Sequence, residues 1–250
     1  MSGLWPVLLV ALLPAAGNFL GGMIADTTRA PPRVLNWALH AAAGIIIAIV
    51  AVELVPAARG VLAGWWIALA FVAGGGAYIA VNSAVKRLQS SSAADERRRM
   101  WMIYAAIAVD LVSDGIMIGT GAAVSLQLAV VLAAGQVLAD VPEGYAAMAN
   151  FRDKGVPRKT RILLSASFFI FVLGATLVAY LLLRHAPDSW QAAGLVFAGA
   201  LLLVAAVEDM LEEAHETRED TRGSVLAFVG GFALFVLVSA GLERALGQVG

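Results

Sequence analysis

Long apolar stretches separated by short polar breaks run along the whole sequence. A helix needs about 20 mostly apolar residues to cross a bilayer. Eight stretches reach that length: residues 4–25, 34–58, 61–86, 100–124, 126–150, 161–184, 190–213 and 223–247. The weakest break, GAAVSLQ at residues 121–127, has to hold a tight turn. This pattern predicts an all-α, polytopic membrane protein with one transmembrane domain, residues 1–250, built as an eight-helix bundle.

Composition supports a membrane protein and excludes several other classes. Hydrophobic residues make up 60% of the chain and charged residues 14%, with no cysteine and a net charge of −1, whereas soluble domains average about 45–50% apolar and 25% charged residues. The lipid bilayer is therefore the expected partner. The near-zero net charge gives no reason to expect nucleic acid. No nucleophile–base pair or nucleotide motif is present, so we do not expect an enzyme.

The basic residues predict how the chain is oriented. All but three of the 17 Lys and Arg residues lie in alternate breaks; the exceptions are Arg59, Arg184 and Arg244. Loops rich in Lys and Arg stay in the cytoplasm. The sequence therefore predicts a multi-pass protein of the cell (inner) membrane with both termini outside the cytoplasm.

Four carboxylates interrupt the fourth and fifth apolar stretches. Asp110 and Asp114 are four residues apart, and Asp140 and Glu143 are three apart, so each pair shares a helix face. A charge at the bilayer centre costs roughly 2.5–3.5 kcal/mol, so these groups must avoid lipid. They are expected to bind a cation, to relay protons, or to form interhelical hydrogen bonds as protonated carboxyls. Pro142 lacks an N–H and is expected to unwind the helix at the Leu138 carbonyl.

Around these residues the sequence resembles the ZIP (Zrt/Irt-like) family of divalent-metal transporters. DLVSDG, residues 110–115, stands where the family's fourth span carries H-N-x-x-[DE]-G, and ADVPEG, residues 139–144, stands where its fifth carries H-[ND]-x-P-E-G. NFLGGMIA, residues 18–25, is typical of its first span. The resemblance implies an eight-helix bundle of ZIP type and one metal site. The implied ligands are Asp110, Asp114, Asp140 and Glu143, with Gln136, Ser113 and Met117 as helpers.

The sequence departs from the family pattern at the metal-binding positions. Asp110 and Ala139 replace both motif histidines, Leu111 replaces the asparagine, and Phe171 stands where members often carry a glutamate. Carboxylates suit harder ions such as Mn²⁺, although Zn²⁺ also accepts them. The expected substrate is therefore a divalent metal ion (Zn²⁺, Fe²⁺, Mn²⁺ or Cd²⁺) moved towards the cytoplasm.

Other polar residues in the spans allow further predictions. Glu53 in the second span, and Glu208 and Asp209 in the seventh, are predicted entrance and exit groups, because acids inside a membrane are usually functional. Five polar residues are expected to make interhelical hydrogen bonds: Asn18, Asn82, Ser165, Ser167 and Ser239. Two alternatives stay open: a proton or monovalent-ion pathway, and a non-transporting sensor or scaffold. A homodimer is also left open.

Overall fold

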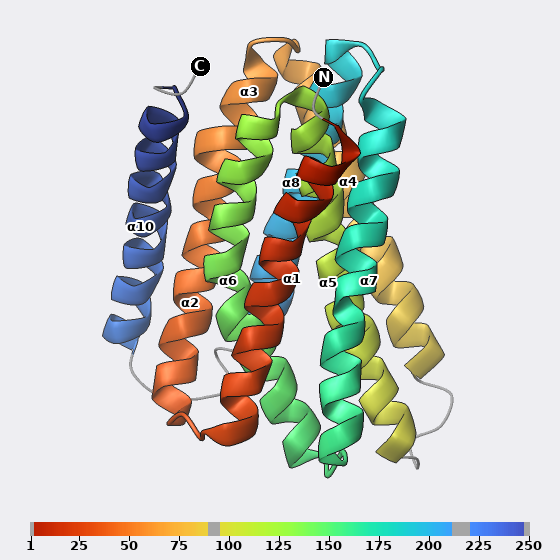
Figure 1. Cartoon of the computed structure of the whole chain (residues 1–250), viewed down its shortest axis with the longest axis vertical. Coiled ribbons are helices and arrows are strands. Elements are labelled where there is room, and N and C mark those ends of the chain that lie inside the picture. The colour runs from red at the N-terminus through yellow and green to blue at the C-terminus, as the bar shows by residue number, and fades with distance from the viewer. Residues whose placement is uncertain (1–2, 90–95, 212–220, 248–250) are drawn as a thin grey trace.

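The computed structural model describes residues 3–89, 96–211 and 221–247, and within these residues helices joined by short turns are the whole of the regular secondary structure (Figure 1). Eight helical rods in it are long and apolar enough to cross a membrane, which confirms the predicted count and a multi-pass membrane protein. The elements are α1 (Leu4–Thr27), α2 (Pro32–Ala48), η1 (Ile49–Leu54), α3 (Val55–Arg59), α4 (Gly64–Gln89), α5 (Glu96–Val124), α6 (Leu126–Asp153), α7 (Arg158–Leu183), α8 (Asp188–Ala205), η2 (Ala206–Met210) and α10 (Thr221–Gly247).

Local sequence explains where several helices begin. Pro31, Pro157 and Pro187 directly precede α2, α7 and α8, and the fixed φ of proline suits the start of a helix. The tight turn expected between the fourth and fifth spans is a single residue, Ser125. Its hydroxyl accepts a hydrogen bond from the Leu128 N–H at 3.0 Å and caps α6. Local sequence at Ser125 therefore explains why α6 begins directly after α5 ends.

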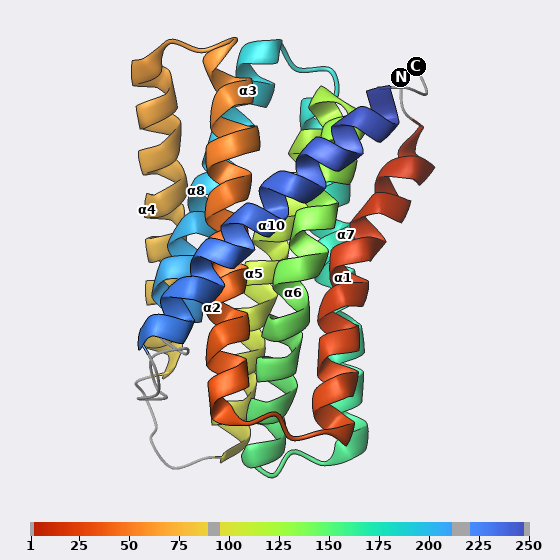
Figure 2. The same ribbon diagram turned by 90° about the vertical axis from the view of Figure 1, so that its left-hand side faces the viewer.

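The rods stand side by side along the long axis of the bundle (Figures 1 and 2). The most extensive contacts join α1 to α6, α5 to α7, α2 to α10 and α4 to α8. The start of α1 and the end of α10 lie at the same end of the bundle, while the α6–α7 turn lies at the other end. An even number of spans requires this arrangement of the two ends.

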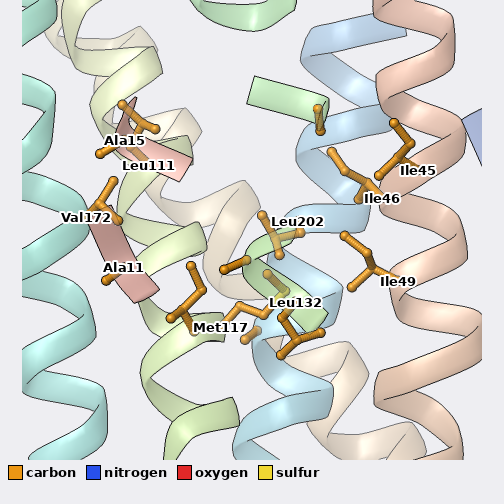
Figure 3. Close-up of a cluster of buried hydrophobic side chains, with 14 of the residues drawn as sticks. Ala11, Ala15, Ile45, Ile46, Ile49, Leu111, Met117, Leu132, Val172 and Leu202 are labelled. Atoms are coloured by element: carbon orange, nitrogen blue, oxygen red, sulfur yellow. The ribbon is translucent and has the colours of Figure 1, made fainter. Parts of the chain in front are cut away.

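Apolar side chains from seven of the eight rods form one buried cluster at the centre of the bundle. Figure 3 shows part of this cluster, including Ala11, Ala15 and Leu111 on one side and Ile46 and Ile49 on the other. Large apolar side chains on the periphery are exposed, for example Trp5, Leu182 and Leu237. Because lipid tails are as apolar as the core, this surface fits a hydrocarbon environment. The carboxylate-bearing helices α5 and α6 both contribute to the buried cluster.

A polar network holds three helices together at the end of the bundle that carries the α6–α7 turn. The Asp26 carboxylate at the end of α1 is fully buried and accepts hydrogen bonds from Arg158 Nε at 2.6 Å and Arg161 Nε at 2.8 Å. Arg152 of α6 donates to the carbonyl oxygens of Ala25 and Thr28 at 2.5 and 3.0 Å. The network therefore ties the end of α1 to α6 and α7.

Candidate mid-membrane carboxylate site

The α5–α6 hairpin brings the predicted carboxylates together. Gln136 of α6 donates a side-chain hydrogen bond to Asp114 Oδ1 of α5. One to two turns farther from Ser125, the carboxyl groups of Glu143 and Asp110 meet across the two helices. We call these the turn-proximal pair (Asp114–Gln136) and the turn-distal pair (Asp110–Glu143).

Asp140 lies between the two pairs and completes the cluster. It follows Gln136 by one turn of α6, precedes Glu143 by three residues, and interacts electrostatically with both Asp114 and Asp110. The hairpin thus collects four carboxyl groups from two helices, although 25 residues of sequence separate Asp114 from Asp140. The four residues predicted as ligands therefore do lie within one interacting group.

This cluster is buried and rich in oxygen atoms that lack donors. Asp114 and Asp140 are each 1% exposed. Within the described part of the chain, Asp114 Oδ2, both Asp140 oxygens, Glu143 Oε2 and Gln136 Oε1 have no hydrogen-bond partner. Burying such groups without a partner is unfavourable. The cluster is therefore suited to accept positive charge, as protons or as a cation.

The turn-distal pair brings two carboxyl groups against each other in a buried site. Two like charges at this distance are unfavourable, so the pair favours a proton or a cation between them. In the described residues, no three His, Cys, Asp or Glu side chains form a group that could hold a metal ion. The carboxyl groups interact pairwise, so joint coordination of one ion would require their side chains to rotate towards a common point.

The predicted helpers divide into two kinds. Gln136 lies in the cluster as the partner of Asp114. Ser113 instead donates to the Val109 carbonyl of its own helix at 3.1 Å, and Met117 is fully buried in the apolar core that Figure 3 shows. Neither Ser113 nor Met117 has a described interaction with the carboxylates, so they are weaker candidates than Gln136.

The backbone of α6 differs from the prediction. Helix α6 is continuous from Leu126 to Asp153 with Pro142 inside it, so the helix is not unwound as expected. The Leu138 carbonyl nevertheless lacks its usual donor four residues on, because Pro142 has no N–H. Helix α6 packs against both α1 and α5, and a proline is tolerated within a membrane-spanning helix that neighbouring helices surround. The site is therefore built from side chains on two regular helices.

Position 171, where the family often has glutamate, lies at an apolar groove. Phe171 packs edge-on against Tyr104, with ring centroids 5.9 Å apart. It also lines two adjoining hollows of about 540 and 320 Å³ between α5, α7 and α8, together with Val112 and Ile116. A phenyl ring suits these apolar surroundings. The structure thus gives Phe171 a packing role.

The predicted entrance and exit acids lie on the two π-helical segments. Glu53 of η1 is largely buried and accepts a hydrogen bond from Ser239 of α10. Glu208 of η2 is exposed, and Asp209 belongs to the same segment, although its side chain lies outside the described residues. Short π-helical segments are frequent at functional sites. The sequence did not reveal them, since no local residue pattern marks them.

The interhelical hydrogen bonds expected from polar residues are only partly observed. Ser239 bonds to Glu53, and the Ser167 hydroxyl bonds to that of Tyr104 at 2.6 Å, which confirms both predictions. Asn18 is different: it is fully buried, yet among the described residues neither its amide oxygen nor its amide nitrogen has a partner. The prediction for Asn18 is therefore wrong.

Comparisons with models of known protein families and with curated proteins found no match to this chain. The likeness to the ZIP family consequently remains a prediction that depends on the motifs at residues 110–115 and 139–144. Functional inference has to rest on the cluster itself, that is, on its burial, its charge and its oxygen atoms.

Proposed function

We propose that this protein carries a divalent transition-metal cation across the membrane towards the cytoplasm, with Asp110, Asp114, Asp140 and Glu143 as its site. One observation carries the proposal: four carboxyl groups on α5 and α6 form one buried, interacting cluster within membrane-spanning helices. Acidic groups at such a depth are energetically costly, and those that proteins retain there usually have a function. A divalent cation would neutralise them and use their unpartnered oxygen atoms.

The chemistry of the cluster bears on which metal is carried. Its candidate ligands are carboxylate oxygens and the Gln136 amide, with no imidazole or thiolate. Oxygen ligands suit Mn²⁺ and other hard ions, whereas imidazole favours Zn²⁺, Cu²⁺ and Ni²⁺. We therefore propose a looser preference than that of histidine-containing carriers, extending to Mn²⁺, Fe²⁺, Zn²⁺ and Cd²⁺. Tight and exclusive binding of Zn²⁺ would contradict this part of the proposal.

The helix packing suggests how such a site could change its exposure. Helices α1, α5, α6 and α7 contact one another extensively, and so do α2 with α10 and α4 with α8. Transporters commonly work by rocking one group of helices against another. In the proposed orientation Glu53 lies towards the outer side and Glu208 towards the cytoplasm, as entrance and exit groups. Their π-helical segments each lie in the later part of a span, and because the second and seventh spans run in opposite directions, the two segments lie towards opposite ends of the bundle, which supports these roles.

Metal uptake into proteoliposomes tests the proposal. Vesicles containing a metal-sensitive dye would be exposed to Zn²⁺, Mn²⁺, Fe²⁺ or Cd²⁺. Uptake is expected for the native chain and lost in Glu143→Gln, because an amide cannot neutralise the ion. Asp153→Asn, an exposed acid on the same helix, is the matched control and should retain uptake. Uptake that survives Glu143→Gln would refute a site on α6.

A proton pathway is the second candidate, and the contact between the Asp110 and Glu143 carboxyl groups favours it, since two carboxyl groups that meet in a buried site can share a proton. The same vesicles, now with a pH-sensitive dye and no metal, distinguish the two functions. Proton flux without metal that is lost in Glu143→Gln would support the proton pathway. Absence of both fluxes from folded protein would support a sensor or scaffold.

A further inference from the structure

Asn18 lies beside the carboxylate cluster on a third helix. Helix α1 packs along α6, and the backbones touch where Asn18 meets Gly144. A methyl group built on Gly144 would come within 1.9 Å of the Asn18 carbonyl oxygen and 2.8 Å of its Cα. Gly144 directly follows Glu143. The backbone contact therefore places Asn18 at the level of the turn-distal pair.

The residues of α1 that pack near α5 place Asn18 at the same height along the bundle. Ala15 lies one turn before Asn18 on the buried face of α1, and it belongs to the same apolar cluster as Leu111. Figure 3 shows both residues on the same side of the buried cluster. Leu111 directly follows Asp110. Asn18, one turn farther along α1 from the start of the helix, thus lies on the side of Ala15 where the Asp110–Glu143 pair is found.

A structural role as a hydrogen-bonding residue does not account for Asn18. Two other buried amide side chains in the bundle have partners: Asn36 accepts from Ser224 at 2.5 Å, and Gln136 donates to Asp114. Asn18 is fully buried, and neither end of its amide has a partner in the described part of the chain. Such unpaired groups are rare in folded proteins and call for an explanation.

We propose that Asn18 belongs to the cation site, where its amide oxygen binds the ion beside Glu143 and its amide nitrogen donates to a neighbouring carboxylate. Amide carbonyl oxygens are good ligands for hard divalent cations. The donor-free oxygens of Asp140 and Glu143 provide acceptors for the amide nitrogen. This inference rests on the proposed function and extends the site from two helices to three.

The absence of cysteine from the chain allows a direct test of the position. Asn18→Cys would carry the sole thiol, and its reaction with a small, water-soluble thiol reagent would be timed with and without Mn²⁺. We expect Mn²⁺ to slow the reaction several-fold. Ala15→Cys, buried on the same face one turn away, should show no effect of Mn²⁺. Equal rates for Asn18→Cys with and without Mn²⁺ would overturn the proposal.

Binding and stability measured together separate a ligand from a packing residue. Asn18→Ala should raise the Kd for Mn²⁺ by about tenfold or more, as loss of groups around a metal site commonly does, without lowering Tm, because no hydrogen bond is removed. Asn18→Asp should bind at least as tightly as the native chain. Asn36→Ala, which removes a bonded buried asparagine, should show the opposite pattern: a lower Tm and an unchanged Kd.

Glu143→Gln distinguishes failure of this inference from failure of the proposed function. If Glu143→Gln abolishes Mn²⁺ binding while Asn18→Ala and Asn18→Asp leave it unchanged, Asn18 is outside the site and only this inference is wrong. If the native chain binds no Mn²⁺, or if Glu143→Gln binds it normally, the carboxylate site itself is wrong. A fall in Tm for Asn18→Ala with an unchanged Kd would assign Asn18 to packing.

Discussion

The contact between α2 and α10 offers a sharp test of the packing, because two adjacent glycines differ in their surroundings. A methyl group on Gly231 would lie 2.1 Å from the Ala41 carbonyl oxygen and 2.8 Å from the Ala41 Cα. Ordinary contact begins at 3.4 Å, about 1.3 Å farther from that oxygen. These are backbone atoms, so no side-chain rotation can relieve the overlap. A methyl group on Gly230 would meet nothing within 4 Å.

The two substitutions therefore differ by packing alone. Gly→Ala inside a helix favours folding by about 1 kcal/mol in both variants. Gly231→Ala must also push α10 away from α2, and overpacking of this kind lowers the free energy of unfolding by typically 1–3 kcal/mol. We expect Gly231→Ala to be destabilised by up to about 2 kcal/mol net. Gly230→Ala should be as stable as the native chain or slightly more stable.

Thermal unfolding in detergent, followed by circular dichroism, measures this difference. For a chain of this size, 1 kcal/mol corresponds to about 2–4 °C in Tm. Gly231→Ala should therefore melt several degrees below Gly230→Ala. If the two variants have the same Tm, the backbones of α2 and α10 do not approach as closely as described. The same result would remove the basis for the Glu53–Ser239 contact between the second span and α10.

Three further substitutions test other contacts through the same melting experiment. Asp26→Asn removes the carboxylate that accepts from Arg158 and Arg161, so the unfolding free energy should fall by about 1.5–3 kcal/mol, and an unchanged Tm would contradict the network. Ser125→Ala removes the cap of α6 and should lower stability by about 1 kcal/mol; a stable variant would mean that the turn does not depend on the hydroxyl. Ser239→Ala removes the donor to Glu53 and should lower the free energy of unfolding by about 0.5–1.5 kcal/mol. Mn²⁺ binding by this variant, measured by calorimetry, should stay at the native level because Glu143 is untouched.

Local sequence features were enough to predict the helices and to single out four carboxylates within two of them. Apolar length alone marked eight spans, since a bilayer sets the length that a helix must reach. The short break at Ser125 predicted a tight turn, which holds α5 and α6 as neighbours. Which side chains of the two helices meet depends on their rotation, so the contact of Asp110 with Glu143 was decided by the tertiary structure. Helix periodicity and turn length are local properties, so a single sequence carries them.

Contacts between helices distant in sequence were decided only by the tertiary structure. The sequence did not show that α1 would press Asn18 against Gly144, that Phe171 would line an apolar groove, or that Ser113 would bond to its own backbone. It also gave no sign of the π-helical segments that hold Glu53 and Glu208. The physical reason is that an apolar side chain gains little by leaving lipid for another helix. Hydrophobicity therefore places each helix in the membrane, and the fit of small residues and polar groups selects its neighbours.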